Sequence, residues 1–255
     1  MHLIKLVVLG APGCGKTSLI KQFVQHTFDD DYRPTEHKQL YYPTVLMDER
    51  LYELQIVDLP PVTFVPRNSY EEWNHFRGYG LRNAHAYLLV FDITSAQSFQ
   101  CVKSLRDQLC ALKGDPLIVI AGNKQDLLIQ EEQQYTVNNN NANANGNCST
   151  GDTANYLHYY HPFTSHQNSR HHHHSGGMNA NENRLSSNDL NKEFAAIAKK
   201  QWKCTYVECS AKFNWRVTAV FSALMKAIDN EDAHAKKQGA SHTQGHNNHR
   251  KCTIL

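Results

Sequence analysis

Residues 10–17 read Gly10-Ala-Pro-Gly-Cys-Gly-Lys-Thr17 and directly follow the apolar run Leu6-Val-Val-Leu9. The spacing G-x-x-x-x-G-K-[ST] after such a run is typical of a strand that enters a phosphate-binding loop at the start of a helix. Glycines let the backbone curl so that its N–H groups point at phosphate oxygens, at the positive end of the helix dipole. Lys16 adds a charge for the β- and γ-phosphates, and the Thr17 hydroxyl can ligate Mg²⁺. The stretch predicts a nucleoside triphosphate site without specifying the nucleotide.

The overall composition excludes several classes of protein. The 26 Lys+Arg against 24 Asp+Glu give a formal charge of +2, so nucleic acid is not an expected partner. Seven cysteines form no C-x-x-C pair and lie mostly in apolar segments, as expected for reduced thiols in the cytosol. The chain starts almost at once with a core strand, which does not resemble a secretory signal. No apolar run approaches the roughly 20 residues of a membrane span.

Apolar runs that alternate with helical periodicity predict an α/β fold with a mainly parallel sheet. Polar residues follow several of these runs, and doubly wound folds use the carboxyl ends of parallel strands to bind ligands. The predicted strands are Leu6–Leu9, Leu40–Met47, Leu51–Val57, Ala86–Phe91, Leu117–Ala121 and Thr205–Glu208. The predicted helices run from the phosphate loop to near His26, around Tyr70–Gly80, and through Val102–Leu112, Leu190–Ile197 and Val217–Ile228.

Residues 129–185 lack apolar periodicity and contain an Asn-rich tract followed by His171–His174. Polar low-complexity sequence cannot bury enough apolar surface to offset the entropy of ordering, so a disordered insertion is predicted. The four histidines are interpreted as part of this tract, with a transition-metal site as the alternative. The domain is therefore expected to span residues 1–230, interrupted by the insertion. The sequence is polar from Asp229 onward, and residues 231–255 are predicted to form a flexible tail.

Five motifs occur in a fixed order: the phosphate loop, Thr35 in a polar loop, Asp58 at a strand end, Asn123-Lys-Gln-Asp126, and Ser210-Ala-Lys212. With these motifs the chain resembles the Ras-like small GTPases over residues 1–128 and 186–230. The stretch Asp58-Leu-Pro-Pro, the run from Tyr206 to Lys212 and the C-terminal cysteine are most similar to the Ras-like protein 10 subgroup. The resemblance implies a phosphate-loop NTPase G domain, with a six-stranded, mostly parallel sheet flanked by helices.

The same resemblance implies GTP and GDP as ligands, with Mg²⁺. The Asp126 carboxylate would accept hydrogen bonds from guanine N–H groups that adenine lacks, and a site of this kind discriminates by about 10⁴ to 10⁵. Asn123 would brace the loops, the Lys124 stem and Phe28 would cover the base, and the Ala211 N–H would reach the guanine carbonyl. The implied nucleotide-binding residues are Gly10, Ala11, Pro12, Gly13, Cys14, Gly15, Lys16, Thr17, Ser18, Phe28, Thr35, Asp58, Asn123, Lys124, Asp126, Ser210, Ala211 and Lys212. The implied Mg²⁺ ligands are Thr17, Thr35 and Asp58, and the catalytic residues are Lys16 and Thr35.

Three residues depart from the Ras pattern. Where Ras relatives have a glycine and a glutamine after the magnesium-side aspartate, this chain has Pro61 and Val62, and Pro12 occupies a glycine position of the phosphate loop. Proline has no N–H for the γ-phosphate, and valine has no polar group to hold the attacking water. We expect slow or impaired GTP hydrolysis, with a non-hydrolysing, GTP-bound membrane adaptor as the alternative. A phosphate-loop kinase or ATPase is disfavoured by the guanine motif.

Two loops are expected to contact effector and regulatory proteins, Thr27–Leu40 and Asp58–Gly80, and the protein is expected to be a monomer. The run Glu36-His-Lys-Gln-Leu40 replaces the acidic effector segment of Ras. Ras effectors that recognise acidic residues are therefore not expected to bind this protein.

The sequence ends Cys252-Thr-Ile-Leu255, a C-a-a-X pattern that favours geranylgeranylation of Cys252. One isoprenoid usually needs a second membrane signal, and the tail offers few basic residues. We expect the cytoplasmic face of the plasma membrane, with a cytosolic pool.

Overall fold

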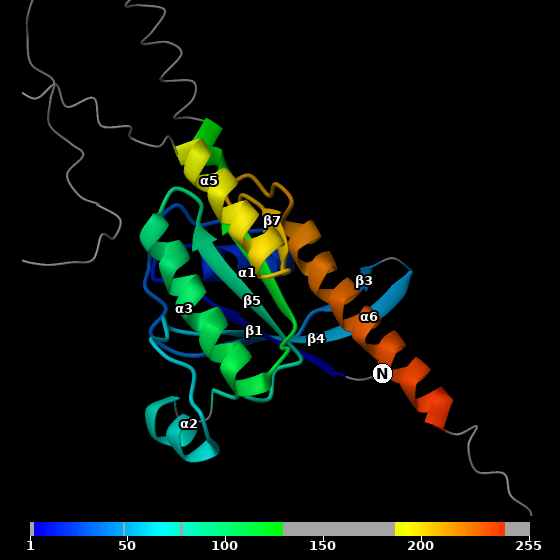
Figure 1. The fold of residues 1–255 in the computed structure, drawn as a ribbon. Coiled ribbons are helices and arrows are strands. Elements are labelled where there is room, and N and C mark those ends of the chain that lie inside the picture. The colour runs from blue at the N-terminus through cyan, green and yellow to red at the C-terminus, as the bar shows by residue number, and fades with distance from the viewer. Residues whose placement is uncertain (1–2, 48, 77–78, 130–186, 243–255) are drawn as a thin grey trace, which may run out of the picture.

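The fold is a seven-stranded sheet with helices on both faces (Figure 1). The computed structural model describes residues 3–47, 49–76, 79–129 and 187–242. The strand order is β2-β4-β1-β5-β6-β7, with β3 also paired to β4; β1 and β4 to β7 run parallel, and β2 and β3 run antiparallel to β4. The predicted mostly parallel α/β sheet is confirmed. The strands are β1 Leu3–Leu9, β2 Gln39–Tyr41, β3 Thr44–Met47, β4 Arg50–Asp58, β5 Ala86–Asp92, β6 Ile118–Asn123 and β7 Thr205–Glu208.

The prediction of one strand over Leu40–Met47 was wrong, because Pro43 divides it into β2 and β3. Proline has no N–H to give to the sheet, although its carbonyl oxygen still accepts a hydrogen bond from the Leu54 N–H at 3.0 Å. The register is continuous across the break, since Leu40 lies opposite Val57 and Thr44 lies opposite Glu53. The sheet therefore has seven strands instead of the expected six without any change of pairing.

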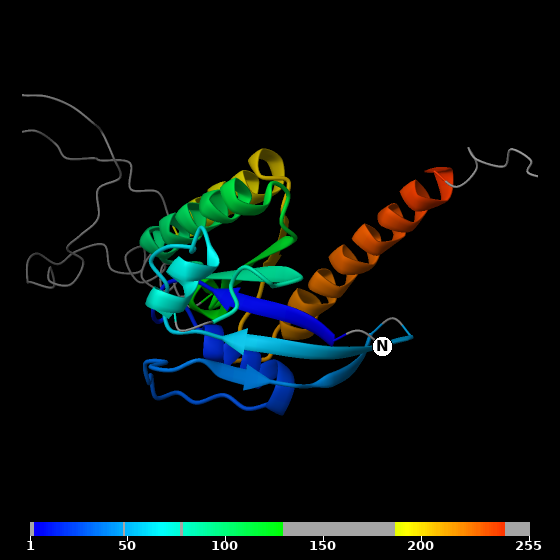
Figure 2. The same ribbon diagram turned by 90° about the horizontal axis from the view of Figure 1, so that it is seen from below.

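Helices cover the two faces of the sheet through separate apolar clusters. Leu19 and Phe23 of α1 and Phe221 of α6 pack on one face, and the Phe23 and Phe221 rings stack at 3.8 Å between centroids. On the other face lie α2, α3, α5 and the short π-helix η1 (Figure 2). The central strand β5 is buried along both faces, which explains its uninterrupted apolar sequence. The helices are α1 Lys16–Gln25, α2 Ser69–Phe76, α3 Ala96–Lys113, α5 Ser187–Ala196, η1 Ile197–Gln201 and α6 Val217–His242.

The last helix is longer than the sequence predicted. The expected polar tail began at Asp229, whereas α6 continues as a helix to His242 and extends beyond the sheet (Figure 2). Asp229 is not a breaker here, because its carboxylate accepts a hydrogen bond from the Tyr52 hydroxyl at 2.6 Å and pairs with Arg50 at 2.8 Å. The residues that follow include Ala, Glu, Lys and Gln, which favour helix.

Several predictions lie outside the described residues. These are the disorder of the insertion from residue 130 onward, the interpretation of His171–His174, and lipidation of Cys252. Within the described part of the chain, no helix combines the length and apolar character needed to cross a membrane.

Candidate functional site

The predicted site residues converge on one edge of the sheet, where the parallel strands end. Strand β1 leads into the phosphate loop, β4 ends at Asp58, β5 at Asp92 and β6 at Asn123. Ser210 follows β7 on the same edge. Motifs that are far apart in the sequence are thereby brought into contact, as the doubly wound fold requires.

The phosphate loop needs its glycines for close approach. A Cβ atom at Gly10 would lie 2.0 Å from the Val90 carbonyl oxygen, and one at Gly15 would lie 2.3 Å from Asn123 Nδ2. Gly15 has a φ of 90° and immediately precedes α1, so the first N–H groups of that helix face the loop. Ser18 lies in the first turn of α1. The loop therefore has the backbone curvature that a phosphate cradle requires.

Two side chains of the loop have defined surroundings. The Lys16 ammonium is buried and donates hydrogen bonds to the carbonyl oxygens of Gly10 and Ala11, both at 3.1 Å. It is thus folded back over the loop, where it would meet the phosphates. Burial raises the pKa of the Cys14 thiol to about 11, so Cys14 is a packing residue that stays protonated at neutral pH.

The three predicted cation ligands lie in direct contact. The Thr17 hydroxyl donates to Asp58 Oδ2 at 2.6 Å, and its oxygen lies 2.8 Å from the Thr35 hydroxyl oxygen. Because the Thr17 proton goes to Asp58, Thr35 is the donor of the second bond. This contact draws the otherwise exposed loop around Thr35 toward the start of α1.

The donor set fits Mg²⁺, a hard cation that prefers oxygen ligands. Asp58 is fully buried, and its Oδ1 atom makes no hydrogen bond of good geometry among the described residues. Burial raises the pKa of the Asp58 carboxyl, whereas the Thr17 hydrogen bond and the Lys16 charge act to lower it. A buried carboxylate oxygen without a partner is costly, and a divalent cation held by Asp58, Thr17 and Thr35 would satisfy it.

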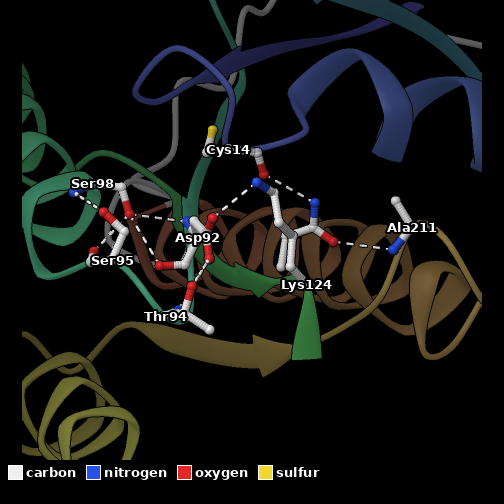
Figure 3. A network of polar contacts seen from close by, with 8 residues as sticks. Cys14, Asp92, Thr94, Ser95, Ser98, Lys124 and Ala211 are labelled. Carbon is white, nitrogen blue, oxygen red and sulfur yellow. Dashed lines mark hydrogen bonds and ion pairs between the residues drawn. The ribbon is translucent and has the colours of Figure 1, made fainter. Parts of the chain in front are cut away.

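Asn123 joins three segments of the site. Its Nδ2 donates to the Cys14 carbonyl oxygen at 3.0 Å, and its Oδ1 accepts from the Ala211 N–H at 3.0 Å (Figure 3). Asn123 is buried, so these bonds replace contacts with water and hold the phosphate loop against the loop after β7. The Ala211 N–H, which was expected to reach guanine, is thus bonded to Asn123 in the structure and would have to be shared with a base.

Asp126 places a carboxylate beside the loop after β7. Its Oδ1 accepts a hydrogen bond from the Ser210 hydroxyl at 2.5 Å, and Ser210 Oγ also accepts from the Phe213 N–H. No other hydrogen bond to Asp126 occurs among the described residues. One carboxylate oxygen is therefore oriented by the protein while the second is left for a ligand.

The remaining base-site residues lie at the surface. Phe28 is 36% exposed, as expected for a ring that covers a ligand from the solvent side. The Lys212 ammonium pairs with Asp30 at 2.9 Å, which links the loop after β7 to the loop that carries Phe28.

The sequence analysis missed Asp92, which orients Lys124. The Lys124 ammonium pairs with Asp92 Oδ2 at 2.8 Å, while Asp92 Oδ1 accepts from the Thr94 N–H and hydroxyl (Figure 3). Lys124 also has a positive φ of 66°, so its backbone turns sharply after β6. An acidic residue directly after a buried strand, as at Asp58, was the signal that could have identified Asp92.

Pro61 and Val62 place no polar side chain near the cation site. Val62 is 5% exposed and packs into the cluster beneath α3. Both residues, with Ala11 and Pro12, line a cavity of about 260 Å³ between the phosphate loop and α3. Thr63 and Ser104 supply the hydroxyl groups among its lining residues.

A curled loop before a helix, a buried carboxylate with an unpaired oxygen, and an asparagine that joins this loop to the loop after β7 define a phosphate-loop nucleotide-binding protein. A model of the Ras family matches residues 5–160, and the chain belongs to this family of small GTPases. Human Ras-like protein family member 10B is 31% identical over 228 residues, which cover 88% of this chain and 85% of that protein. Human member 10A is 30% identical over 250 residues, with 94% and 95% covered. Ras-like protein rasU of Dictyostelium discoideum is 34% identical over 145 residues, with 56% and 63% covered. The resemblance to the Ras-like protein 10 subgroup is confirmed.

Proposed function

We propose that this protein is a GTP-binding signalling protein that hydrolyses GTP slowly and is attached to a membrane through Cys252. The observation that carries the slow hydrolysis is the placement of the residues after Asp58. Pro61 has no N–H to donate to a γ-phosphate, and the side chain of Val62 is apolar and buried in the cluster that includes Leu105 of α3. In this family a glycine and a glutamine supply the phosphate contact and the water contact.

Guanine specificity is supported by the Asp126 carboxylate. Ser210 occupies one of its oxygens, and the other can accept from the ring N–H and the exocyclic amine of guanine. Adenine has no donors in that arrangement, so the buried acceptor would be left without a partner. Mg²⁺ would be held by Thr17, Thr35 and Asp58, and it would neutralise charge on the β- and γ-phosphates.

The groups that this chain itself offers to the phosphates are the Lys16 ammonium and the Thr35 hydroxyl. Lys16 places a charge above the loop, and Thr35 contributes a hydroxyl that is already within contact of Thr17. An arginine supplied by an activating protein would have to pass Pro12, which is exposed and lines the cavity beside the phosphate loop. The chain therefore binds and orients the nucleotide but lacks the groups that accelerate its cleavage.

Membrane attachment is proposed on the C-a-a-X ending, with leucine favouring a geranylgeranyl group on Cys252. The protein would then reside on the cytoplasmic face of the plasma membrane, with a cytosolic pool because a single lipid binds reversibly. Mass spectrometry of the C-terminal peptide, combined with fractionation of wild type and Cys252→Ser, tests this. An unmodified Cys252 in membrane-bound protein would refute it.

The nucleotide assignment is tested on the purified full chain by identifying the bound nucleotide and by competition between GTP, GDP and ATP. Equal affinity for ATP and GTP would contradict the proposal, and Asp126→Asn should shift preference toward xanthine nucleotides. Single-turnover hydrolysis should proceed at or below the intrinsic Ras rate of about 10⁻⁴ per second. A faster rate would exclude slow hydrolysis, and no turnover at all would identify a GTP-bound adaptor.

A further inference from the structure

We infer that the nucleotide state is communicated to partner proteins through residues 27–40 alone, while residues 59–76 and 79–81, here called the anchored segment, keep one conformation in the GDP and GTP forms. The inference rests on the proposed guanine-nucleotide function. It divides the two loops that were expected to contact partners into one responsive loop and one fixed surface.

Apolar burial holds the anchored segment against the sheet and α3. Leu59 is fully buried, and Val62, Val65 and Phe76 are 5%, 5% and 8% exposed. All four belong to the same cluster as Leu105 of α3. Displacing the segment would expose these side chains to water, which is unfavourable in proportion to the apolar area uncovered.

Polar contacts hold the same segment at further points. The Val65 N–H donates to Gln108 Oε1 of α3 at 2.8 Å. Farther along, the buried Glu72 side chain accepts from the Leu81 N–H at 2.5 Å, and the Leu81 carbonyl oxygen accepts from the Tyr87 hydroxyl. Breaking these bonds without replacement would leave buried polar groups unsatisfied.

The nucleotide has no visible means of pulling the anchored segment out of place. Pro61 lies at the cavity beside the phosphate loop, yet it carries no N–H that a γ-phosphate could capture. Its neighbour Val62 offers only apolar contact. A ligand can shift a conformational equilibrium only by binding the two states differently. The side chains of Pro61 and Val62 offer no polar group for this, and the Thr63 hydroxyl is the polar side-chain group that the segment places on the cavity.

Residues 27–40 have the opposite character. Every residue from Thr27 to Leu40 except Thr35 is exposed, so the loop has almost no buried anchor. At its end, Gln39 and Leu40 belong to β2 and pair with β4. Before β2, the described side-chain contacts that hold this loop to other segments are the Thr35 contact with Thr17 and the Asp30 pair with Lys212. Because Thr35 lies at the cation site, loss of the γ-phosphate and rearrangement of the cation shell would release this loop first.

This arrangement determines what a partner can distinguish. A protein that binds only the GTP form must contact residues 27–40. A protein that contacts only Tyr70 and Trp73, which are 76% and 71% exposed on α2, would bind the GDP and GTP forms with equal affinity.

Hydrogen exchange of the full chain, loaded with GDP or with a non-hydrolysable GTP analogue in Mg²⁺, tests the inference. Amides of residues 27–40 should differ between the two forms by at least about fivefold, and amides of residues 59–76 by less than about twofold. Bound nucleotide is measured chromatographically on the same samples. A chain that retains neither nucleotide overturns the proposed function and with it this inference, whereas a nucleotide-dependent change in residues 59–76 overturns this inference alone.

Two variants test whether apolar burial is what holds residues 59–76 in place. Val65→Ala with Phe76→Ala removes apolar contacts and should increase exchange in residues 59–76 in both nucleotide forms by at least about tenfold. Trp73→Gln changes an exposed residue of the same helix and should leave exchange unchanged. Equal exchange of the two variants would show that burial does not hold the segment and would overturn the inference.

Discussion

The two ends of the sheet use polar side chains in different ways. At the carboxyl edge of the parallel strands, Asn123 holds two loops together, and Asp58 bonds to Thr17 through Oδ2 while its Oδ1 stays available to a ligand. At the opposite end, the Asp229 carboxylate accepts a hydrogen bond from the Tyr52 hydroxyl and forms an ion pair with Arg50. These two contacts attach α6 to the β3–β4 hairpin. The first set of contacts is open to a ligand, and the second joins two elements of the fold.

This difference teaches that burial and hydrogen bonding alone do not mark a binding site. Both ends contain buried or half-buried polar groups at short distances. At the nucleotide edge, a buried oxygen of Asp58 lacks a partner, and the loop backbone at Gly10 and Gly15 leaves no room for a Cβ atom. Substitutions at the two ends should therefore separate ligand affinity from stability.

The largest effect is expected for Asn123→Ala at the nucleotide edge. Loss of the bonds to the Cys14 carbonyl and the Ala211 N–H would separate the phosphate loop from the loop after β7, and GDP affinity should fall by about 100-fold, or about 3 kcal/mol. Titration with a fluorescent GDP analogue measures this. Asn74→Ala, an identical change at an exposed position, serves as the control, and equal affinities of the two variants would contradict the assigned role.

A smaller and different effect is expected for Tyr52→Phe at the opposite end. The variant removes only the hydroxyl that donates to Asp229, so the free energy of unfolding should fall by about 1 kcal/mol. GDP affinity should stay the same within about twofold, because the site lies at the other end of the sheet. Chemical denaturation at fixed nucleotide concentration measures the free energy of unfolding. A weakened GDP affinity would show that the two ends are coupled.

The smallest effect is expected for Lys212→Ala. Its ammonium pairs with Asp30 across an exposed surface, where water and salt screen the attraction. The GDP dissociation rate should change by less than about threefold, and the change should diminish further at high salt. Stopped-flow displacement of a fluorescent nucleotide measures it. A large, salt-independent change would mean that Lys212 contacts the base directly.

Much of the nucleotide edge could be predicted from the sequence because its chemistry depends on short, fixed spacings. The phosphate loop, Asp58 and Asn123-Lys-Gln-Asp126 each follow an apolar strand directly, so their location at one sheet edge follows from strand order. Asp92 obeys the same rule but belongs to no motif, and it was missed. The ion pair with Lys124 depends on two strands being neighbours in space, which spacing along the chain does not reveal.

The opposite end could not be predicted in the same way. The break at Pro43 depends on a single missing N–H within an otherwise regular strand pattern. The length of α6 was underestimated because the apolar periodicity stops at Ile228, whereas the helix continues on helix-favouring polar residues after the Asp229 contacts. A long-range side-chain contact of this kind leaves no periodic signal.

The extension of α6 makes this helix a lever arm. An α-helix rises about 1.5 Å per residue, so the stretch from Asp229 to His242 is about 20 Å long. With Asp229 as the last described contact to the sheet, a tilt of about 10° at that point would displace the far end by about 3 Å. A change in the β3–β4 hairpin too small to alter the nucleotide edge would thus be magnified wherever the chain continues after His242. The buried apolar face of α6 sets the direction of the helix up to Ile228, and the Asp229 contacts are the last described ones that support the extension beyond it.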